Sequence, residues 1–193
     1  STLYPNPVNP RFGTFVARSL EALAKRGDWR VTLINPIGLP PLALGRYRPL
    51  AELPETSEEG GITIYRPRFT LIPRIGAWRN AAAIARAALP LVRRIHAVTP
   101  IDVLDAQFFF PDGPAAAQIA RETGLPLSIK ARGSDITFWG HQDFARRQML
   151  EAAHTASGLL AVSRDLAAQM VLMGMDERKI TPVSYTHLTL PTN

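Results

Sequence analysis

The chain has 193 residues, of which 46% are hydrophobic, and this length allows one good-sized domain with a full hydrophobic core. The absence of cysteine excludes a disulfide scaffold and a thiolate metal site, and it fits a reducing compartment. The sequence has no apolar run long enough to span a bilayer and no signal peptide. We expect a cytoplasmic protein. The formal net charge of +6 favours an anionic partner: a nucleotide, a phospholipid surface or nucleic acid.

The chain begins in an extended segment that leads into a helix. Residues 1–4 are typical of the end of a strand whose beginning is missing, and three prolines then force an extended loop. Gly13 follows, and apolar residues recur at helical spacing as far as Gly27, a good helix stop. Free N–H groups at this helix start suit a phosphate, although no full dinucleotide or P-loop glycine pattern is present.

Strands and helices alternate through the rest of the chain. The expected elements are a strand at 30–35, a long surface loop at 36–61, a strand at 62–66, a loop at 69–76, a helix at 77–98 that Pro90 kinks or splits, a strand at 101–106, a helix at 115–123, a strand at 126–131, a helix at 144–153, a strand at 158–162, a helix at 164–173 capped by Ser163, and a strand at 180–183. This alternation predicts an α/β protein with a Rossmann-like parallel sheet and helices on both faces.

A Gly-Ser-Asp turn follows the strand expected at 126–131. In open α/β sheets, loops at the carboxyl ends of strands bind ligands. Gly133 would let the backbone approach a ligand, and Ser134 and Asp135 would offer partners for sugar hydroxyls. Arg132 would offer a planar fork for an anion. The alternative is a structural turn in which Asp135 caps the following helix.

The positive charge is concentrated in one part of the chain. No acidic residue occurs between Glu59 and Asp102, whereas this interval contains seven Arg: Arg66, Arg68, Arg74, Arg79, Arg86, Arg93 and Arg94. The last four share a broad sector if residues 77–98 are helical, and Trp78 lies beside them. Such a surface is typical of an in-plane contact with anionic lipid; the alternative is a solvated face on a sheet-covering helix.

Patterns for metal binding or paired-carboxylate catalysis are missing from the sequence. No two carboxylates have a recognisable catalytic spacing. His96, His141 and His154 are scattered, and none has a His or Glu at i+3 or i+4. We therefore expect no metal, and we interpret each His as an ordinary surface or interfacial residue.

Four stretches occur in an order and spacing that resemble one enzyme family. They are L-Y-P-N-P-V-N-P-R-F-G-T-F-V at 3–16, I-D-V-L-D-A-Q-F-F-F-P-D-G-P-A-A-A at 101–117, R-G-S-D-I at 132–136 and L-L-A-V-S-R-D-L at 159–166. Together they resemble the N-terminal half of a family 4-type glycosyltransferase of the GT-B fold, which transfers a sugar from a nucleotide donor with retention. The resemblance extends to Val183. It implies that this Rossmann-like domain mainly holds the acceptor, and that a C-terminal domain, missing here, holds the nucleotide sugar.

The resemblance also implies roles for residues of the matched stretches. Gly13 corresponds to the loop near the donor phosphates, and Ser163 to a helix start, where we expect a cap first and a ligand contact second. Arg132 stands where many relatives carry a histidine beside the transferred sugar, which puts a His-dependent role there in doubt. The residues expected on the acceptor side are Phe110, Asp112, Gly113, Arg132, Gly133, Ser134 and Asp135.

These residues come from loops that are far apart in the sequence. A parallel sheet brings such loops together along one edge, so we expect one cleft that contains Gly13, Phe110, Asp112, Arg132, Ser134 and Asp135. Retaining transfer needs a leaving diphosphate stabilised by positive charge and helix N-termini rather than by a protein nucleophile. No catalytic residue is assigned.

Three functions are weighed. The leading hypothesis is the acceptor-binding half of a glycosyltransferase of cell-envelope polysaccharide biosynthesis, which moves a sugar from a nucleotide sugar to a glycan or lipid-linked acceptor, in the cytoplasm or on the inner face of the membrane. The second is a non-catalytic α/β module that binds a nucleotide or an anionic metabolite. Nucleic-acid binding rests on charge alone, because no helix-turn-helix, RNP or zinc pattern occurs, and we expect no such partner.

The last ten residues, 184–193, have no place in the pattern of elements. The stretch V-S-Y-T-H-L at 183–188 resembles a translated reading frame of a transposase adapter used in sequencing libraries. We interpret 184–193 as a non-native tail, the alternative being a genuine polar tail. Residues 1–183 are then one N-terminal domain with a truncated first strand, which we expect to be inactive alone.

Overall fold

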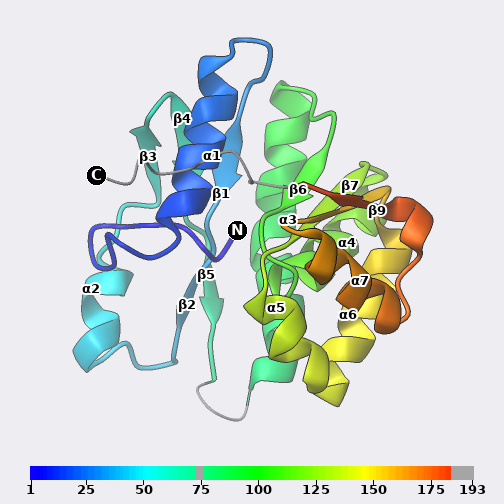
Figure 1. Ribbon diagram of the computed structural model, residues 1–193. Helices are drawn as coiled ribbons and strands as arrows, with labels where there is room; N and C mark the ends of the chain where they lie inside the picture. The colour runs from blue at the N-terminus through cyan, green and yellow to red at the C-terminus, as the bar shows by residue number, and fades with distance from the viewer. Residues whose placement is uncertain (73–75, 184–193) are drawn as a thin grey trace, which may run out of the picture. The chain divides into compact units, whose positions relative to one another are not determined.

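The computed structural model describes residues 1–72 and 76–183. Arg74 and the suspected tail at 184–193 lie outside the described residues. The chain divides into two units, Ser1–Ile101 and Asp102–Asn193, both of which combine helices with parallel strands (Figure 1). The predicted α/β class is therefore confirmed.

The first unit contains two small sheets. Its elements are α1 (Thr14–Lys25), β1 (Thr32–Ile34), β2 (Ile37–Leu39), η1 (Gly45–Tyr47), α2 (Arg48–Ala51), β3 (Thr56–Glu59), β4 (Ile62–Tyr65), β5 (Arg68–Thr70), η2 (Ala77–Arg79) and α3 (Asn80–Val98). One sheet has the order β1-β4-β3, with β1 and β4 parallel and β3 antiparallel to β4. The other pairs β2 with β5 in parallel, and their arrowheads point the same way in Figure 1.

Two prolines separate these two sheets. Pro36 lies between β1 and β2, and Pro67 lies between β4 and β5. A proline has no backbone N–H to donate to a neighbouring strand, so the pairing is interrupted at both positions. Hydrogen bonds on either side span the interruption: the Asn35 N–H donates to the Tyr65 carbonyl at 2.8 Å, and the Ile37 N–H to the Pro67 carbonyl at 2.9 Å. The two chain segments thus stay paired beyond the prolines.

Three predictions for the first unit are wrong. The segment 36–61, expected as a surface loop, contains β2, η1, α2 and β3, and β5 occupies the start of the loop expected at 69–76. The turn of the β3–β4 hairpin consists of Gly60 and Gly61, both with positive φ (57° and 79°), which is the backbone that a two-residue hairpin favours. Residues 1–4 form no strand, although the Ser1 amino group donates to the Ile34 carbonyl at 2.6 Å.

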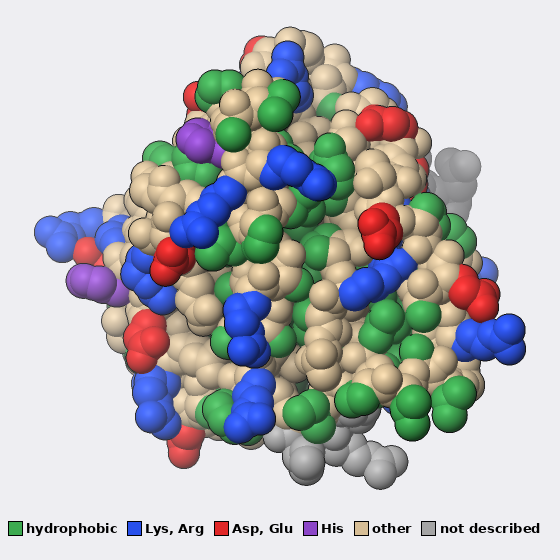
Figure 2. Space-filling model, turned by 180° about the vertical axis from the view of Figure 1, so that it is seen from behind, with side chains coloured by type: hydrophobic (Ala, Val, Ile, Leu, Met, Phe, Trp, Pro, Cys, Tyr) green, Lys and Arg blue, Asp and Glu red, His purple; other side chains and the backbone are tan. Residues whose placement is uncertain are grey.

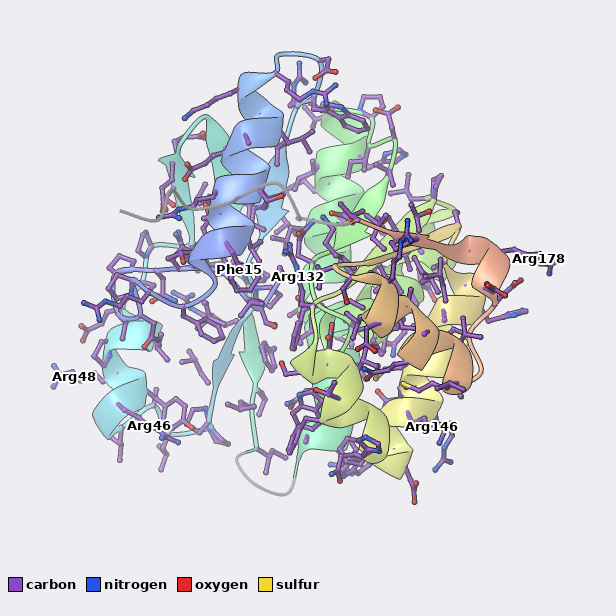
Figure 3. All side chains as sticks on the ribbon, viewed as in Figure 1. Phe15, Arg46, Arg48, Arg132, Arg146 and Arg178 are labelled. Atoms are coloured by element: carbon purple, nitrogen blue, oxygen red, sulfur yellow. The ribbon has the colours of Figure 1, made fainter. Side chains whose placement is uncertain are left out.

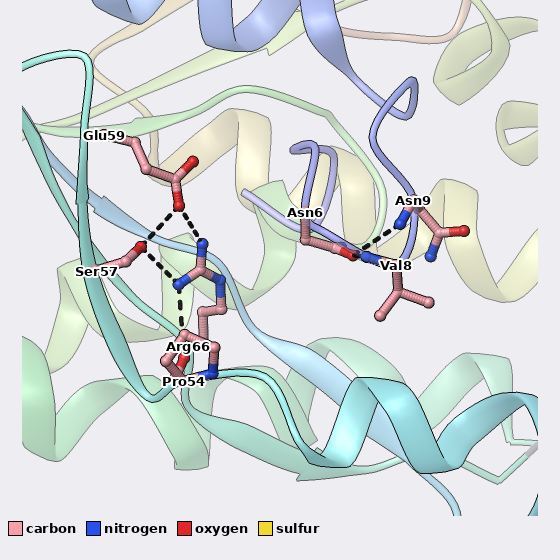
Figure 4. Close-up of polar contacts among 7 residues, drawn as sticks. All are labelled: Asn6, Val8, Asn9, Pro54, Ser57, Glu59 and Arg66. Atoms are coloured by element: carbon pink, nitrogen blue, oxygen red, sulfur yellow. Dashed lines mark hydrogen bonds and ion pairs between the residues drawn. The ribbon is translucent and has the colours of Figure 1, made fainter.

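Arg66 is a basic side chain that lies inside the first unit. It is 1% exposed, and its Nη2 forms an ion pair with Glu59 Oε1 at 2.8 Å (Figure 4). Its Nη1 donates to Ser57 Oγ at 2.8 Å and to the Pro54 carbonyl at 3.5 Å. A buried charge is tolerated when it is paired and hydrogen-bonded in this way. Arg66 therefore contributes to the interior of this unit and not to its surface charge.

The second unit contains one sheet of four parallel strands. Its elements are β6 (Leu104–Ala106), α4 (Asp112–Thr123), β7 (Leu127–Ala131), α5 (Ser134–Thr137), η3 (Trp139–His141), α6 (Asp143–Thr155), β8 (Gly158–Ala161), α7 (Arg164–Leu172), η4 (Glu177–Lys179) and β9 (Ile180–Pro182). The strand order is β6-β7-β8-β9, and each neighbouring pair is parallel. The strands and helices predicted from residue 101 onward are confirmed, with displaced boundaries.

The predicted cap of α7 is also confirmed. Ser163 has extended backbone angles, and its Oγ accepts the Leu166 N–H at 3.1 Å. This is the bond that an N-cap serine makes to a free N–H of the first turn. The hydrophobic core of the second unit includes Leu166 of α7, together with Ile129 of β7 and Met149 of α6, which are fully buried.

Candidate functional site

The turn after β7 is built around the carboxylate of Asp135, which is fully buried. Its Oδ1 accepts the N–H groups of Gly133 at 2.8 Å, Arg132 at 3.0 Å and Ile136 at 3.1 Å. Its Oδ2 accepts the N–H of Phe109 at 2.8 Å and also that of Arg132 at 3.0 Å. Because Phe109 belongs to the loop after β6, one carboxylate joins the loops that follow two neighbouring strands.

This environment decides what Asp135 does. The helix α5 begins at Ser134, so its N-cap position is Gly133 and not Asp135. Burial raises the pKa of Asp135 above its ordinary value, while the four backbone N–H groups favour the charged form and oppose the increase. A fully buried carboxylate that accepts this many backbone N–H groups positions the turn, and its contact with an acceptor stays a prediction.

Gly133 supplies the backbone conformation on which the turn depends. Its φ of 129° and ψ of −81° are rarely reached by residues with a Cβ. A Cβ at this position would have no atom within 4 Å, so the requirement for glycine comes from the backbone angles and not from lack of space. Its carbonyl accepts the N–H groups of Ile136 and Thr137, both at 2.8 Å.

Arg132 is half-buried and is held by the loop after β6 (Figure 3). Its Nε donates to the backbone carbonyl of Gln107 at 3.1 Å, and its Nη2 donates to the side-chain oxygen of the same residue. Gln107 is buried, and its amide nitrogen donates in turn to the carboxylate of Asp105. The guanidinium therefore has a fixed orientation. Gln107 and Asp105 belong to this candidate site, although no pattern in the sequence singles them out.

The loop after β6 contributes mainly buried residues. Phe110 is 1% exposed and packs on Trp139 and Phe144, with ring centroids 4.9 and 5.9 Å away. Asp112 is buried at the start of α4. A Cβ on Gly113 would lie 3.2 Å from a methyl group of Ile129, so glycine lets α4 approach β7 closely. These residues support the site, and their contact with an acceptor stays a prediction.

All seven residues expected on the acceptor side belong to the second unit. They lie in the loops at the carboxyl ends of β6 and β7, as the topology of a parallel sheet requires. Ser134 is exposed and Arg132 and Gly133 are half-buried, whereas the buried members are Phe110, Asp112, Gly113 and Asp135.

Gly13 belongs to the first unit, where it precedes α1. Its φ of 69° lies in the left-handed region. A Cβ would lie 2.8 Å from the carbonyl carbon of Leu3 and 2.9 Å from the nitrogen of Tyr4, which is closer than real Cβ contacts. Backbone angles and close packing therefore both require glycine here. The expected place of Gly13 beside donor phosphates stays a prediction.

The exposed side of α3 carries the basic residues expected on one sector. The buried residues of α3 are Ala81, Ile84, Ala85, Ala88 and Val92. Four basic side chains are exposed here: Arg79, Arg86, Arg93 and Arg94. The first three recur every seven residues, which is nearly two helical turns, so they project on the side of the helix opposite the buried residues. Pro90 lies inside α3 and does not split it, so that part of the prediction is wrong.

The basic interval is less uniform than its composition suggests. Arg66 is internal, and Arg68 donates to the backbone carbonyls of Leu53 and Arg66. Trp78 is 52% exposed, and the guanidinium carbon of Arg79 lies 4.4 Å from its ring centroid. Figure 2 shows one face of the molecule, on which Lys and Arg side chains lie among apolar and acidic ones.

Among residues 1–72 and 76–183, no three His, Cys, Asp or Glu side chains gather as they would to hold a metal ion. Within the same part of the chain, no helix has the length and apolar character needed to cross a membrane. Among the three His of these ranges, His96 accepts the Ile101 N–H on its Nδ1 at 2.9 Å.

Comparison with known proteins identifies the family. Residues 12–186 match the family described as Glycosyl transferase 4-like domain, and the chain belongs to this family. It is 27% identical over 188 residues to TuaC of Bacillus subtilis (strain 168), a protein provisionally named as a teichuronic acid biosynthesis glycosyltransferase. This alignment covers 95% of the chain but 48% of TuaC, so the chain spans about half the length of this curated relative.

A solved structure shares the fold. Sucrose-phosphate synthase from Thermosynechococcus elongatus superposes with a TM-score of 0.62 at 13% sequence identity, over 88% of this chain and 83% of that one. At this identity the likeness concerns the fold alone, and it supports the Rossmann-like α/β prediction.

We predict that Asp135→Asn lowers the free energy of unfolding by about 2–4 kcal/mol, because an amide NH₂ replaces an oxygen that accepts buried N–H groups and leaves some of them unpaired. Urea denaturation of the chain measures the change. Asp143→Asn is the matched control, since Asp143 is exposed in the first turn of α6 and its change should stay within about 0.5 kcal/mol. Equal losses in the two variants would contradict the structural role of Asp135.

We predict that Gly13→Ala costs about 3 kcal/mol or more in the absence of any nucleotide, because strain from the left-handed backbone adds to overlap with residues 3 and 4. Gly27→Ala is the control: Gly27 has a φ of 80°, but a Cβ there would have no atom within 4 Å, so only the backbone cost of about 1 kcal/mol should remain. A loss at Gly13 no larger than that at Gly27 would show that close packing does not require this glycine.

Proposed function

We propose that the chain is the acceptor-binding half of a glycosyltransferase that moves a hexose-type sugar from a nucleotide-sugar donor to a glycan or lipid-linked acceptor. The observation that carries the proposal is the turn after β7, whose backbone is fixed by the buried carboxylate of Asp135 at the carboxyl end of a parallel strand. Ligand sites in open α/β sheets lie at such ends. Family membership supports the reaction class.

The arrangement around Arg132 supports the same proposal. The guanidinium is held in a fixed orientation by Gln107, so it needs no reorganisation when a polar ligand approaches. Ser134, the first residue of α5, is exposed and carries a hydroxyl group. A fixed cation beside an exposed hydroxyl can bind the oxygen atoms of a sugar, and neither group requires a metal ion or another cofactor.

The similarity to TuaC supports an acceptor from cell-envelope polysaccharide biosynthesis. Because the chain spans about half of that relative, we assign binding of the nucleotide sugar mainly to a second domain of a longer protein. The competing function is a binding module for a nucleotide or an anionic metabolite, which would need no second domain.

We predict that residues 1–183 alone transfer no sugar, and that the longer protein encoded by the contiguous gene does, because the donor site is divided between two domains. The measurement is transfer of radiolabelled sugar from UDP-glucose, UDP-N-acetylglucosamine and UDP-glucuronic acid to a membrane extract. Transfer by residues 1–183 alone would refute the divided site. A gene that ends directly after this domain would instead favour the binding module.

A peripheral contact with an anionic membrane is part of the proposal. Its support is the exposed side of α3, where four Arg lie opposite the buried residues and Trp78 stays half-exposed beside Arg79. Arg and Trp side chains together suit the boundary between headgroups and acyl chains. Such a contact would bring a lipid-linked acceptor to the enzyme.

We predict that the chain sediments with anionic phosphatidylglycerol vesicles at low salt and that Arg79→Glu with Arg86→Glu weakens this binding at least about tenfold, since each basic residue near the surface adds about 1 kcal/mol. Arg146→Glu with Arg147→Glu on α6 is the control of equal charge change, and Figure 3 shows Arg146 projecting away from that helix. Equal binding to neutral vesicles, or equal weakening by both pairs, would contradict the contact.

A further inference from the structure

Phe138 is a large aromatic side chain that the second unit leaves on its surface. It is 58% exposed, although it follows directly on the turn whose interior is formed by Asp135. Its N–H donates to the carbonyl of Ser134 at 3.0 Å, so the two residues lie one helical turn apart on α5 and its continuation. Residues four apart on a helix share a face. The exposed ring therefore lies on the same side as the exposed hydroxyl of Ser134.

The single turn of α5 has two different sides. Asp135 and Ile136 point inward and are 0% and 2% exposed, whereas Ser134, Thr137 and Phe138 are exposed. The Thr137 hydroxyl donates to the carbonyl of Gly133 at 3.2 Å, and its oxygen can still accept a hydrogen bond. The outer side thus combines one aromatic ring with two hydroxyl groups on a backbone that the inner side holds rigid.

One aromatic residue, Trp139, contacts the ring of Phe138. The two rings meet edge to face, with ring centroids 5.2 Å apart and an interplanar angle of 82°. Trp139 in turn packs on Phe110 at 4.9 Å and on Phe144 at 6.3 Å. Behind them, a Cβ on Gly140 would lie 2.9 Å from the sulfur of Met173, so this segment is tightly packed. An exposed ring on such a base loses little conformational freedom when a ligand binds to it.

We propose that Phe138, with the hydroxyls of Ser134 and Thr137, is a platform that binds one pyranose ring of the acceptor. A pyranose has an apolar face of C–H groups, which can cover the aromatic ring, and hydroxyl groups at its edge, which can bond to the two side-chain hydroxyls. An apolar surface with a few placed polar groups is the usual composition of a small-ligand site. The proposal rests on the proposed function, because it concerns the acceptor of that reaction.

Trp139 provides a direct test in the chain itself, since it contacts Phe138 and its fluorescence responds to changes at that ring. The variant Trp29→Phe with Trp78→Phe leaves Trp139 as the only tryptophan. We expect saturable fluorescence changes at millimolar concentrations of cellobiose, N,N′-diacetylchitobiose or glucuronic acid, and none with glycerol. Adding Phe138→Ala should weaken binding at least tenfold, whereas Phe138→Tyr should preserve it. No saturable change with any of the three saccharides, or an equal change after Phe138→Ala, would overturn the platform.

The longer protein provides a second test that separates the platform from the reaction. There, Phe138→Ala should raise the KM for the acceptor at least tenfold and leave the KM for the nucleotide sugar unchanged, and Trp29→Ala, at another exposed aromatic residue, should change neither. A different result would be that Phe138→Ala lowers the Tm of the longer protein, but not that of residues 1–183, and leaves both KM values unchanged. The ring would then be a contact between domains, and the platform proposal would be wrong. If the unaltered longer protein transfers no sugar, the proposed function fails, and the saccharide titration alone decides the platform.

Discussion

The carboxylate of Asp135 is the interaction on which the rest of the site depends. A buried carboxylate without partners would be costly, and here backbone N–H groups from two loops surround it. The same bonds satisfy N–H groups at the ends of β6 and β7 that have no partner in the sheet. The loops are consequently held before any ligand arrives. The backbone of Arg132 and the outer side of α5 are positioned by this anchor, and Gln107 then orients the Arg132 guanidinium.

The elements from residue 101 onward could be predicted because each leaves its own local signal. Leu127–Ala131 is an apolar run bounded by Pro126 and Gly133, and Ser163 stands directly before an apolar helical pattern. The segment 36–61 leaves no such signal. β2 has three residues, and β3 reads T-S-E-E with three of its four residues exposed, so neither shows an alternation of apolar and polar residues. The overlooked indication was the Gly60-Gly61 pair before I-T-I-Y, which is typical of a two-residue hairpin.

The position of the turn after β7 could be predicted, but the direction of its side chains could not. R-G-S-D after a buried strand identifies the turn, and sequence reasoning then gave a ligand role to each of its residues. Which of them faces inward depends on the Phe109 N–H, 26 residues away, and the orientation of Arg132 depends on Gln107, 25 residues away. Contacts at such separations leave no periodic pattern in the chain. The burial of individual charged residues could not be predicted either. The series of Arg residues in the sequence does not indicate that Arg66 pairs with Glu59 inside the first unit.

A turn of four residues can both anchor a loop and present a binding surface only if its two sides are unequal. On α5 the inner side carries the acidic residue and Ile136, and the outer side carries hydroxyls and leads to an aromatic ring. Moving the chain by one residue would expose Asp135 and bury Ser134, which would lose the anchor and the surface together. The rigidity of the inner side and the chemistry of the outer side therefore depend on the same register. That register is fixed by Gly133, whose backbone angles turn the chain at the end of β7.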